Sequence, residues 1–368
     1  MTERLHYDAR MARPSRPPAG PTINDLAQHL GVHKSTVSRA MDPARRHLIG
    51  ADLLQRVEAT ARELGWRPNR AAAALSTGRS RTVGVLLPDI TNPVFPPILR
   101  GIEDALDEEG YFALLANTAR RDGGQAAAQL AVERMLAQRV EGFLVATAMR
   151  DDAWLEGLRK GGARIVLVNR TDGRGLLPAV TSDDLLAMRL AVDPLVALGH
   201  RRIAHLAGPA GFSTGQARRA GFEQALQAHG LVPAAVVDCE AYTIEAGDAA
   251  MARLFATRRA FTAVVAANDL IALGALQVLQ ARGVAVPDAV SLIGHNDMPL
   301  LAQLRPPLTS VRIQHYEMGY RAARLLLEAL RGVPGTASAL VLRPELVVRG
   351  STAAAASKLR AARARAGG

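Results

Sequence analysis

Cysteine, aromatic residues and long apolar runs are scarce in this 368-residue sequence. Its single cysteine, Cys239, excludes an internal disulfide framework and any metal site built on clustered cysteines. No run approaches the ~18 consecutive apolar residues of a membrane-spanning helix. The N-terminal segment also lacks the apolar stretch of about 7–15 residues that a secretory signal needs. We therefore expect a cytoplasmic protein with no membrane partner.

Positive charge is concentrated at the two ends of the chain, and the net charge is +11. Residues 1–81 contain 14 Arg and Lys against 7 Asp and Glu, whereas residues 82–350 contain 27 of each. Residues 351–368 contain 4 basic residues and no acidic ones. A basic N-terminal fifth on a neutral body is typical of a small polyanion-binding module joined to a domain that binds something else. Charge alone leaves a solubilising basic tail as the alternative.

The N-terminal part divides into an arm, a helical domain and a linker. Residues 1–21 are rich in proline and arginine, so we expect a disordered basic arm. Three short amphipathic patterns follow, and Thr22 is a good N-cap for the first of them. They predict a compact helical domain at residues 22–67. Residues 68–81 contain helix breakers at both ends and are expected to link this domain to the rest.

From residue 82 onward, short β-rich runs alternate with helical stretches. Near-continuous apolar strands between helices predict a parallel sheet that is covered on both faces. About ten strands are many for one open sheet, so two Rossmann-like lobes are expected over residues 82–350, with a closed (β/α)8 barrel as the alternative. Residues 351–368 are expected to form a disordered tail. The predicted strands are 82–87, 112–115, 142–146, 164–168, 179–181, 202–207, 234–237, 263–266 and 290–293.

The segment TINDLAQHLGVHKSTVSRAM, residues 22–41, has the spacing of a helix-turn-helix. Ala27 allows the two helices to cross closely, Gly31 can adopt the positive φ of the turn, and Val37 anchors the second helix on the first. The second helix could then enter the major groove of DNA. The alternative is a packing unit with a solvated polar face. The candidate DNA contacts on this helix are Lys34, Ser35, Thr36, Ser38 and Arg39.

This segment and several others resemble the LacI/GalR family of bacterial transcriptional regulators. The resemblance implies an α/β fold with an N-terminal three-helix helix-turn-helix domain and a hinge helix, followed by a two-lobed periplasmic-binding-protein-like core of type I. It also implies a sequence-specific repressor whose operator affinity is controlled by an effector bound between the lobes. The other similar segments are ELGWRPNRAAAALSTGRSRTVGVLLPDITNPVF (63–95), VNR (168–170), LGHRRIAHLAGP (198–209), AANDLIALGAL (266–276) and PPLTSVR (306–312).

The resemblance implies that residues 69–75 form the hinge helix. In the family, such a helix inserts one leucine from each subunit into the minor groove at the operator centre, and Leu75 holds that position here. Asn69 and Arg70 are the accompanying candidate DNA contacts. So short a helix is marginal alone, so we expect it to fold only on DNA and against its dimer mate. A linker helix packed on the core is the alternative.

Polar residues follow the carboxyl ends of the predicted strands, where parallel α/β sheets bind ligands. By resemblance, Arg218, Asn268 and Asn296 match family positions that touch the effector. Helix capping is an equal alternative for Asp89, Asp269 and Asp297 in these loops, and a surface ion pair is the alternative for Arg218. The full set of effector candidates is Asp89, Asn92, Phe95, Arg170, Asp183, Arg218, Asn268, His295 and Asn296.

Two departures from the family bear on the ligand. Sugar-binding members often carry a carboxylate at the position of Asn296, and a further arginine at the position of Gln216. Arg170, Arg218 and His295 have no evident matching acid in the sequence. This combination favours an anionic effector, such as a sugar acid or another carboxylate, over a neutral sugar.

Three other functions remain as alternatives. A transporter's solute-binding protein shares the core fold, but the basic module and the absent signal peptide oppose it. An α/β enzyme is opposed by the lack of H-E-x-x-H, G-x-S-x-G and Cys/His motifs. A purely architectural DNA-binding role would leave the neutral body unexplained. We expect no catalytic residue, metal or cofactor. The expected partners are a pseudo-palindromic DNA operator, a small-molecule effector (a sugar or a carboxylate) and a second copy in a homodimer.

Overall fold

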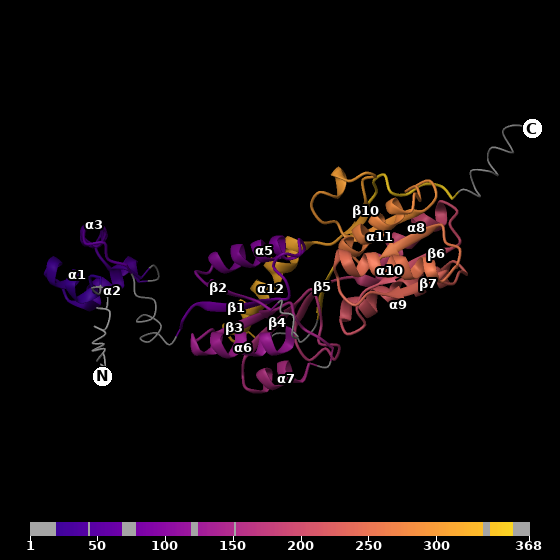
Figure 1. The fold of residues 1–368 in the computed structure, drawn as a ribbon. Coiled ribbons are helices and arrows are strands. Elements are labelled where there is room, and N and C mark those ends of the chain that lie inside the picture. Colours follow the sequence, from indigo (N-terminus) through magenta and orange to yellow (C-terminus); the bar gives the residue numbers. More distant parts are fainter. Residues whose placement is uncertain are drawn as a thin grey trace, which may run out of the picture. The chain divides into compact units, whose positions relative to one another are not determined.

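The computed structural model describes residues 20–42, 45–67, 79–118, 124–150, 152–333 and 339–355. The chain divides into two compact units between Ser80 and Arg81, both drawn in Figure 1. Most of the predicted arm and tail, and most of the predicted hinge segment, lie outside the described residues. Among the described residues, no helix combines the length and the apolar character needed to cross a bilayer.

The first unit packs three helices around a small apolar core, as the sequence predicts. Thr22 caps the first helix through a reciprocal capping box with Asp25, and Gly31 ends it with a φ of 64°. Leu26, Val37 and Val57 are fully buried between the helices. The elements are α1 (Ile23–Leu30), α2 (Lys34–Ala40), η1 (Arg46–Leu48) and α3 (Ala51–Glu63).

The second unit contains two six-stranded sheets, so the two-lobed interpretation is confirmed and the closed barrel is wrong. The strand orders are β11-β5-β4-β3-β1-β2 and β12-β10-β9-β8-β6-β7. Every described pair of neighbouring strands is parallel except β10 with β12. The strands are β1 (Thr82–Leu87), β2 (Phe112–Asn117), β3 (Gly142–Val145), β4 (Arg164–Val168), β5 (Ala179–Ser182), β6 (Ile203–Ala207), β7 (Ala235–Asp238), β8 (Ala263–Ala266), β9 (Ser291–Asn296), β10 (Thr309–Arg312), β11 (Ala339–Leu342) and β12 (Glu345–Val347).

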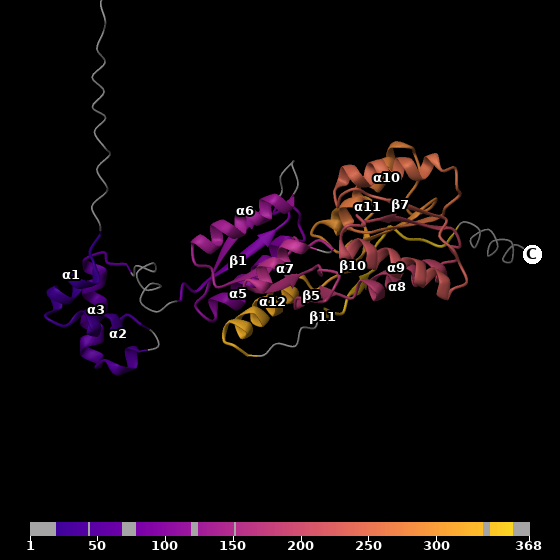
Figure 2. The ribbon, with the colours of Figure 1, turned by 90° about the horizontal axis from the view of Figure 1, so that it is seen from below.

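Helices cover both faces of each sheet (Figure 2). In the first lobe, α5 and α12 pack on one face while α6 and α7 pack on the other. In the second lobe, α10 and α11 cover one face while α8 and α9 cover the other. These helices are α5 (Phe95–Asp107), α6 (Gly124–Ala137), α7 (Ala153–Lys160), α8 (Asp184–Ala197), α9 (Ser213–Ala228), α10 (Ile244–Ala256), α11 (Asp269–Ala281) and α12 (His315–Leu330), with a short turn η2 (Leu301–Gln303).

The chain passes between the lobes three times, after β5, between β10 and α12, and between β11 and β12. The Asp183 backbone N–H donates to the Leu342 carbonyl at 3.0 Å and so ties two of these connections together. Because only a few residues join the lobes at each crossing, small dihedral changes there can reorient one lobe against the other. The carboxyl ends of β1, β4 and β5 belong to the first lobe, and those of β6, β8 and β9 to the second.

All nine predicted strands are present, three of them (β1, β4 and β8) with the predicted ends and the others with shifted ends. Strands β10, β11 and β12 were not predicted. Residues 351–355, which the sequence analysis assigns to a disordered tail, instead pack on the second lobe. Ser351 is 1% exposed because its hydroxyl donates to the Leu292 carbonyl and accepts from the Thr309 backbone N–H.

Helices α5 and α12 lie together in the first lobe although they come from distant parts of the chain (Figure 1). A Cβ built on Gly101 would lie 2.1 Å from the Tyr316 carbonyl oxygen. One built on Gly319 would lie 1.9 Å from the Ile98 carbonyl oxygen. The two glycines therefore permit an approach that no larger residue allows.

We predict that Gly319→Ala destabilises the core by about 1–3 kcal/mol, because the new methyl group collides with backbone of the facing helix. The matched control is Gly157→Ala in α7, where a Cβ meets nothing within 4 Å. That change should be neutral or stabilise by up to ~1 kcal/mol, since alanine favours a helix. Urea unfolding of the full chain measures both. Equal midpoints for the two variants would contradict this close packing.

Candidate functional site

Helix α2 has a polar face toward solvent and an apolar face that packs on the other two helices. Lys34, Ser38 and Arg39 are exposed, whereas Val37 and Ala40 are buried against the other two helices. The two basic side chains are therefore available to a ligand, while the helix that carries them is fixed by packing. This is the arrangement that a helix reading base edges requires.

His33 caps the start of α2. The Ser35 backbone N–H donates to His33 Nδ1 at 3.3 Å, and the Ser35 hydroxyl lies 2.8 Å from the same atom. Ser35 and Thr36 are half-buried, so less of each side chain is available to DNA than of the exposed residues. The predicted hinge contacts Asn69, Arg70 and Leu75 lie outside the described residues.

Some predicted effector residues use their polar atoms within their own loops. Asp89 Oδ1 accepts from the backbone N–H and the hydroxyl of Thr91, at 2.9 and 2.7 Å. Asn92 Oδ1 accepts from the Val94 backbone N–H at 3.2 Å. Phe95 is 3% exposed and belongs to the apolar core of the first lobe. These contacts shape the loop that follows β1.

Two further candidates cap helices, a role expected at Asp89, Asp269 and Asp297 instead. Asp183 Oδ1 accepts from the Leu186 backbone N–H at 2.9 Å, at the start of α8. Asn268 Oδ1 accepts from the Ile271 backbone N–H at 2.9 Å, at the start of α11. The role of both residues in effector binding stays a prediction.

Arg170, Phe212, Tyr242 and Arg218 form a layer at the boundary between the lobes. Arg170 follows β4 in the first lobe, and its guanidinium carbon lies 3.8 Å from the centroid of the Phe212 ring in the second. The Phe212 and Tyr242 rings are stacked, with centroids 6.2 Å apart. Arg218 lies 5.8 Å from the Tyr242 centroid. We call these four residues the aromatic layer.

Arg218 is neutralised inside the second lobe. Its Nε donates to Asp184 Oδ1 at 2.8 Å and its Nη1 donates to the Ala267 carbonyl at 2.8 Å. The two side chains are only 4% and 9% exposed. Burial alone would lower the pKa of Arg218, but the adjacent Asp184 carboxylate raises it above the usual value. The guanidinium therefore stays protonated.

Arg170 differs from Arg218 because it has no counter-charge among the described residues. It is 7% exposed, and its Nε has no hydrogen-bond partner. Burial, with a smaller contribution from Arg218, lowers its pKa from the usual value of an arginine to about 10. The side chain is still cationic at neutral pH, so an unbalanced positive charge remains at the lobe boundary.

His295 and Asn296 end β9 in the second lobe. His295 is fully buried, and its Nδ1 donates to Asn296 Oδ1 at 2.9 Å. Burial lowers the pKa of His295 well below its usual value, so the ring is neutral. Nε2 lies 3.6 Å from Asp184 Oδ1 and has no hydrogen-bond partner within the described residues. Asn296 has a φ of 111°, outside the usual range of a non-glycine residue.

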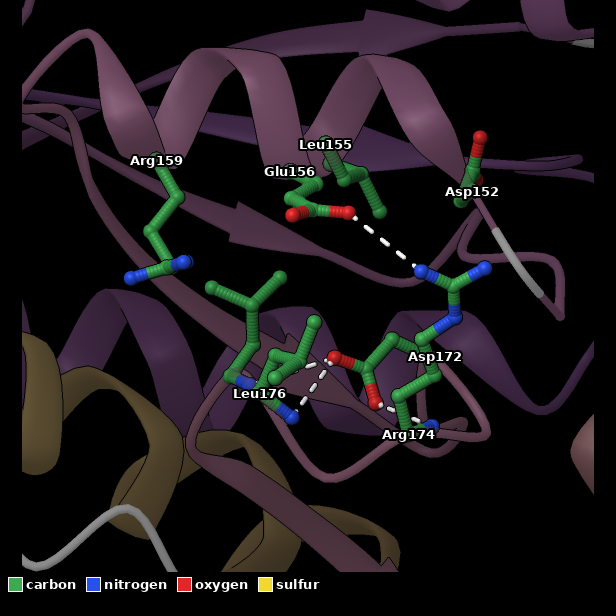
Figure 3. Close-up of a pocket in the computed structure, with 8 residues that line it drawn as sticks. Asp152, Leu155, Glu156, Arg159, Asp172, Arg174 and Leu176 are labelled. Carbon is green, nitrogen blue, oxygen red and sulfur yellow. Dashed lines mark hydrogen bonds and ion pairs between the residues drawn. The ribbon is translucent and has the colours of Figure 1, made fainter.

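The loop that follows Arg170 is organised by one carboxylate, seen in Figure 3. Asp172 is 6% exposed, which removes it from competing water. Its two oxygens accept four backbone N–H groups at 2.7 to 3.2 Å, from Arg174, Gly175, Leu176 and Leu177. Next to it, the Thr171 backbone N–H donates to the Ser213 hydroxyl of the other lobe at 2.9 Å. The backbone beside Arg170 is therefore fixed from both sides.

Comparison with known proteins identifies the family. Residues 192–352 match the periplasmic binding protein-like domain family. The chain is 37% identical to the HTH-type transcriptional regulator MalR of Streptomyces coelicolor, over 90% of this chain and 97% of that protein. It is 33% identical to the HTH-type transcriptional repressor CytR of Escherichia coli, over 90% of this chain and 96% of that protein. The chain belongs to the LacI/GalR family of bacterial transcriptional regulators.

Solved structures agree with this assignment to the LacI/GalR family. The Lac repressor dimer bound to operator and the anti-inducer ONPF has a TM-score of 0.82 and 27% identity, covering 91% of this chain and 100% of that one. The complex of the regulator CelR with cellobiose has a TM-score of 0.69 and 31% identity, covering 90% and 99%. The protein is a ligand-controlled, DNA-binding transcriptional regulator and not an enzyme, as the sequence predicts.

The structure corrects one argument about the effector of this LacI/GalR-family protein. In the sequence, Arg170, Arg218 and His295 are basic groups without an evident matching acid. Asp184 is that acid for Arg218, and the pair is buried and not on the surface. His295 is neutral. Arg170 alone keeps an unmatched positive charge.

Sequence reasoning missed Asp184, Asp172, Phe212 and Tyr242 as site residues. Asp184 gave no separate signal in the sequence. It directly follows Asp183, and an acidic residue at the start of a helix is normally explained by capping. The two aromatic residues offered a signal, since aromatics make up 4% of the chain and these two follow the neighbouring strands β6 and β7. Cys239 is 2% exposed, and burial raises its pKa to about 12.

We predict that Asp184→Asn destabilises the core by about 3–5 kcal/mol, because it leaves Arg218 buried without a counter-charge. Replacing both partners, Asp184→Asn with Arg218→Met, should recover at least half of that loss, since no buried charge remains. The control is Asp193→Asn, whose partner His229 and own side chain are partly exposed, and it should cost less than ~1 kcal/mol. Urea unfolding measures all three. A double variant as unstable as the single one would contradict the ion-pair account.

Proposed function

We propose that this protein is a repressor that binds a pseudo-palindromic operator as a homodimer and changes its operator affinity when an effector binds between the lobes. The aromatic layer carries the proposal, because it brings side chains of both lobes together around buried polar groups that have no internal partner. A ligand there would contact both lobes and so favour one relative orientation over another. Induction and co-repression are both consistent with this linkage.

DNA binding is assigned to the exposed face of α2. Lys34 and Arg39 are placed to donate to guanine, whereas Thr36 and Ser38 suit phosphate oxygens. Ser35 joins them as a contact at the start of the helix. Asn69, Arg70 and Leu75 complete the interface as the hinge segment, which pairs with its dimer mate in the minor groove. The relatives regulate transcription, so the site of action is the bacterial cytoplasm, on the nucleoid when operator is bound.

Effector binding is assigned to the strand ends around the aromatic layer. Arg170, Arg218, His295 and Asn296 are the central contacts, since the structure brings them near one another. Asn268 and Asp183 lie at the starts of α11 and α8, whereas Asp89, Asn92 and Phe95 belong to the loop after β1. The relatives whose ligands are named bind cellobiose or the anti-inducer ONPF, which supports a small organic molecule as the ligand.

The exposed apolar side chains of β2 support the homodimer. This strand lies at the edge of the first sheet. Phe112, Leu114 and Leu115 are 43%, 36% and 37% exposed. Phe112 and Leu114 share one face of this strand and Leu115 lies on the other, so the exposed edge carries apolar side chains on both faces, as protein interfaces often do. A second copy related by a two-fold axis would cover them with the same residues.

The DNA assignment is tested by Arg39→Ala. Full-length protein first selects duplexes from a random library, and fluorescence anisotropy then measures affinity for the selected duplex. We expect a loss of about 1–3 kcal/mol and relaxed preference at one base position, because a base contact is removed. The control is Arg62→Ala, an exposed arginine on α3, which loses the same charge and should keep the base preference. Failure of the dimeric protein to select any duplex would contradict the proposed function.

The dimer assignment is tested by Leu114→Lys. A two-fold interface places two copies of the new charge near each other, so we expect a shift from dimer to monomer at micromolar concentration and weaker binding of the selected duplex. Analytical ultracentrifugation measures the first effect. The control is Val348→Lys, which changes a side chain that is 67% exposed in the second lobe and should leave the dimer intact. Unchanged sedimentation of the Leu114 variant would contradict this interface.

A further inference from the structure

We infer that the effector of this regulator carries a negatively charged group, a carboxylate or a phosphate, that binds Arg170. The inference rests on the proposed function and adds the chemical class of the ligand. It does not follow from the family, since the related regulator CelR binds cellobiose, a neutral sugar. It follows from the charges and contacts of this chain.

Arg170 is a buried cation that has no partner among the described residues. Its side chain is 93% buried, since 7% is exposed, and no described residue forms a hydrogen bond or an ion pair with it. An unpaired buried charge is strongly unfavourable, so such residues are normally paired or coordinate a ligand. The protein keeps Arg170 in this state while the neighbouring backbone is fixed by Asp172 and by the contact from Thr171 to Ser213. The side chain is therefore presented by a rigid loop.

The contact with Phe212 leaves the binding edge of the guanidinium free. The ring lies 3.8 Å from the guanidinium carbon and covers one face of the group by a cation–π contact. The N–H groups lie in the plane of the guanidinium, so stacking does not consume them. A planar fork of N–H donors matches the two oxygens of a carboxylate or a phosphate. Neutral hydroxyls would leave the charge uncompensated.

The other charged groups around the aromatic layer already have partners. Arg218 pairs with Asp184 at 2.8 Å. Asp297 pairs with Arg312 and Arg349 at 2.8 and 2.6 Å. Asp269 accepts from the Ser310 hydroxyl and the Met298 backbone N–H. His295 is neutral, and its Nε2 already faces Asp184 Oδ1 at 3.6 Å. Among these groups, Arg170 is the one left to bind the negative charge.

The first test needs no knowledge of the natural ligand. Thermal unfolding of the full-length protein is followed while chloride is replaced by acetate, sulfate or inorganic phosphate at constant ionic strength. We expect at least one anion to raise the Tm of the wild type by a few degrees at millimolar concentration, because it binds the folded state alone. Acetate and phosphate report on the carboxylate and phosphate classes separately. Equal Tm values in all four salts would overturn the inference.

Variants of Arg170 separate specific binding from general salt effects. Arg170→Gln should raise the Tm in chloride, because an unpaired buried charge is gone, and should abolish the shift with the other anions. Arg170→Lys should keep part of the shift, since it keeps the charge without the fork. The control Arg219→Gln removes an arginine that already pairs with Glu223 and Asp238, and it should respond like the wild type. A lower Tm for Arg170→Gln in chloride, or an undiminished anion shift, would overturn the inference.

The second test compares neutral sugars with their acids and phosphates. Calorimetry is run with glucose, gluconate and glucose 6-phosphate, and with galactose and galacturonate, on wild type and Arg170→Gln. An acid or phosphate that binds the wild type at least tenfold more tightly than its neutral partner, with the difference lost in the variant, supports the inference. A neutral sugar bound equally by both proteins overturns it but leaves the proposed function intact. Failure to select any duplex overturns the proposed function and leaves the anion result unaffected.

Discussion

Two arginines meet a pair of stacked aromatic rings at the boundary between the lobes, and only one of them has a carboxylate. Arg218 is balanced by Asp184 inside the second lobe, so that part of the layer is complete without a ligand. Arg170 enters from the first lobe and is buried with its charge unmatched. The imbalance lies where the two halves of the core meet, which is where a bound group can influence their relative orientation.

The fold explains why this imbalance arises at that position. In each lobe the parallel strands end at the same edge of the sheet, so residues far apart in sequence gather there. Arg170 follows β4, whereas Phe212 and Tyr242 follow β6 and β7. The three connections between the lobes lie beside these strand ends. A change in the layer is therefore next to the segments that must bend if the lobes move.

Much of this architecture could be predicted from the sequence because it depends on local patterns. Thr22, Gly31 and Val37 define the helix-turn-helix through capping, a turn and an anchoring contact between neighbours. Nine of the strands could be predicted from their apolar composition. The balance of charge could not be predicted, because it depends on which residues meet across the fold. Arg218 and Asp184 are 34 positions apart, and Ser351 closes the second sheet from 59 positions beyond Leu292. No local pattern in the sequence predicts such pairs.

The most direct test of ligand control measures the affinity of the full-length dimer for its selected duplex, with and without the acid that stabilises the protein most. The account predicts that this acid changes duplex affinity at least tenfold in the wild type. Arg170→Gln should show no response to the acid, because the cation that binds it is gone. An equal response in both proteins would contradict the account.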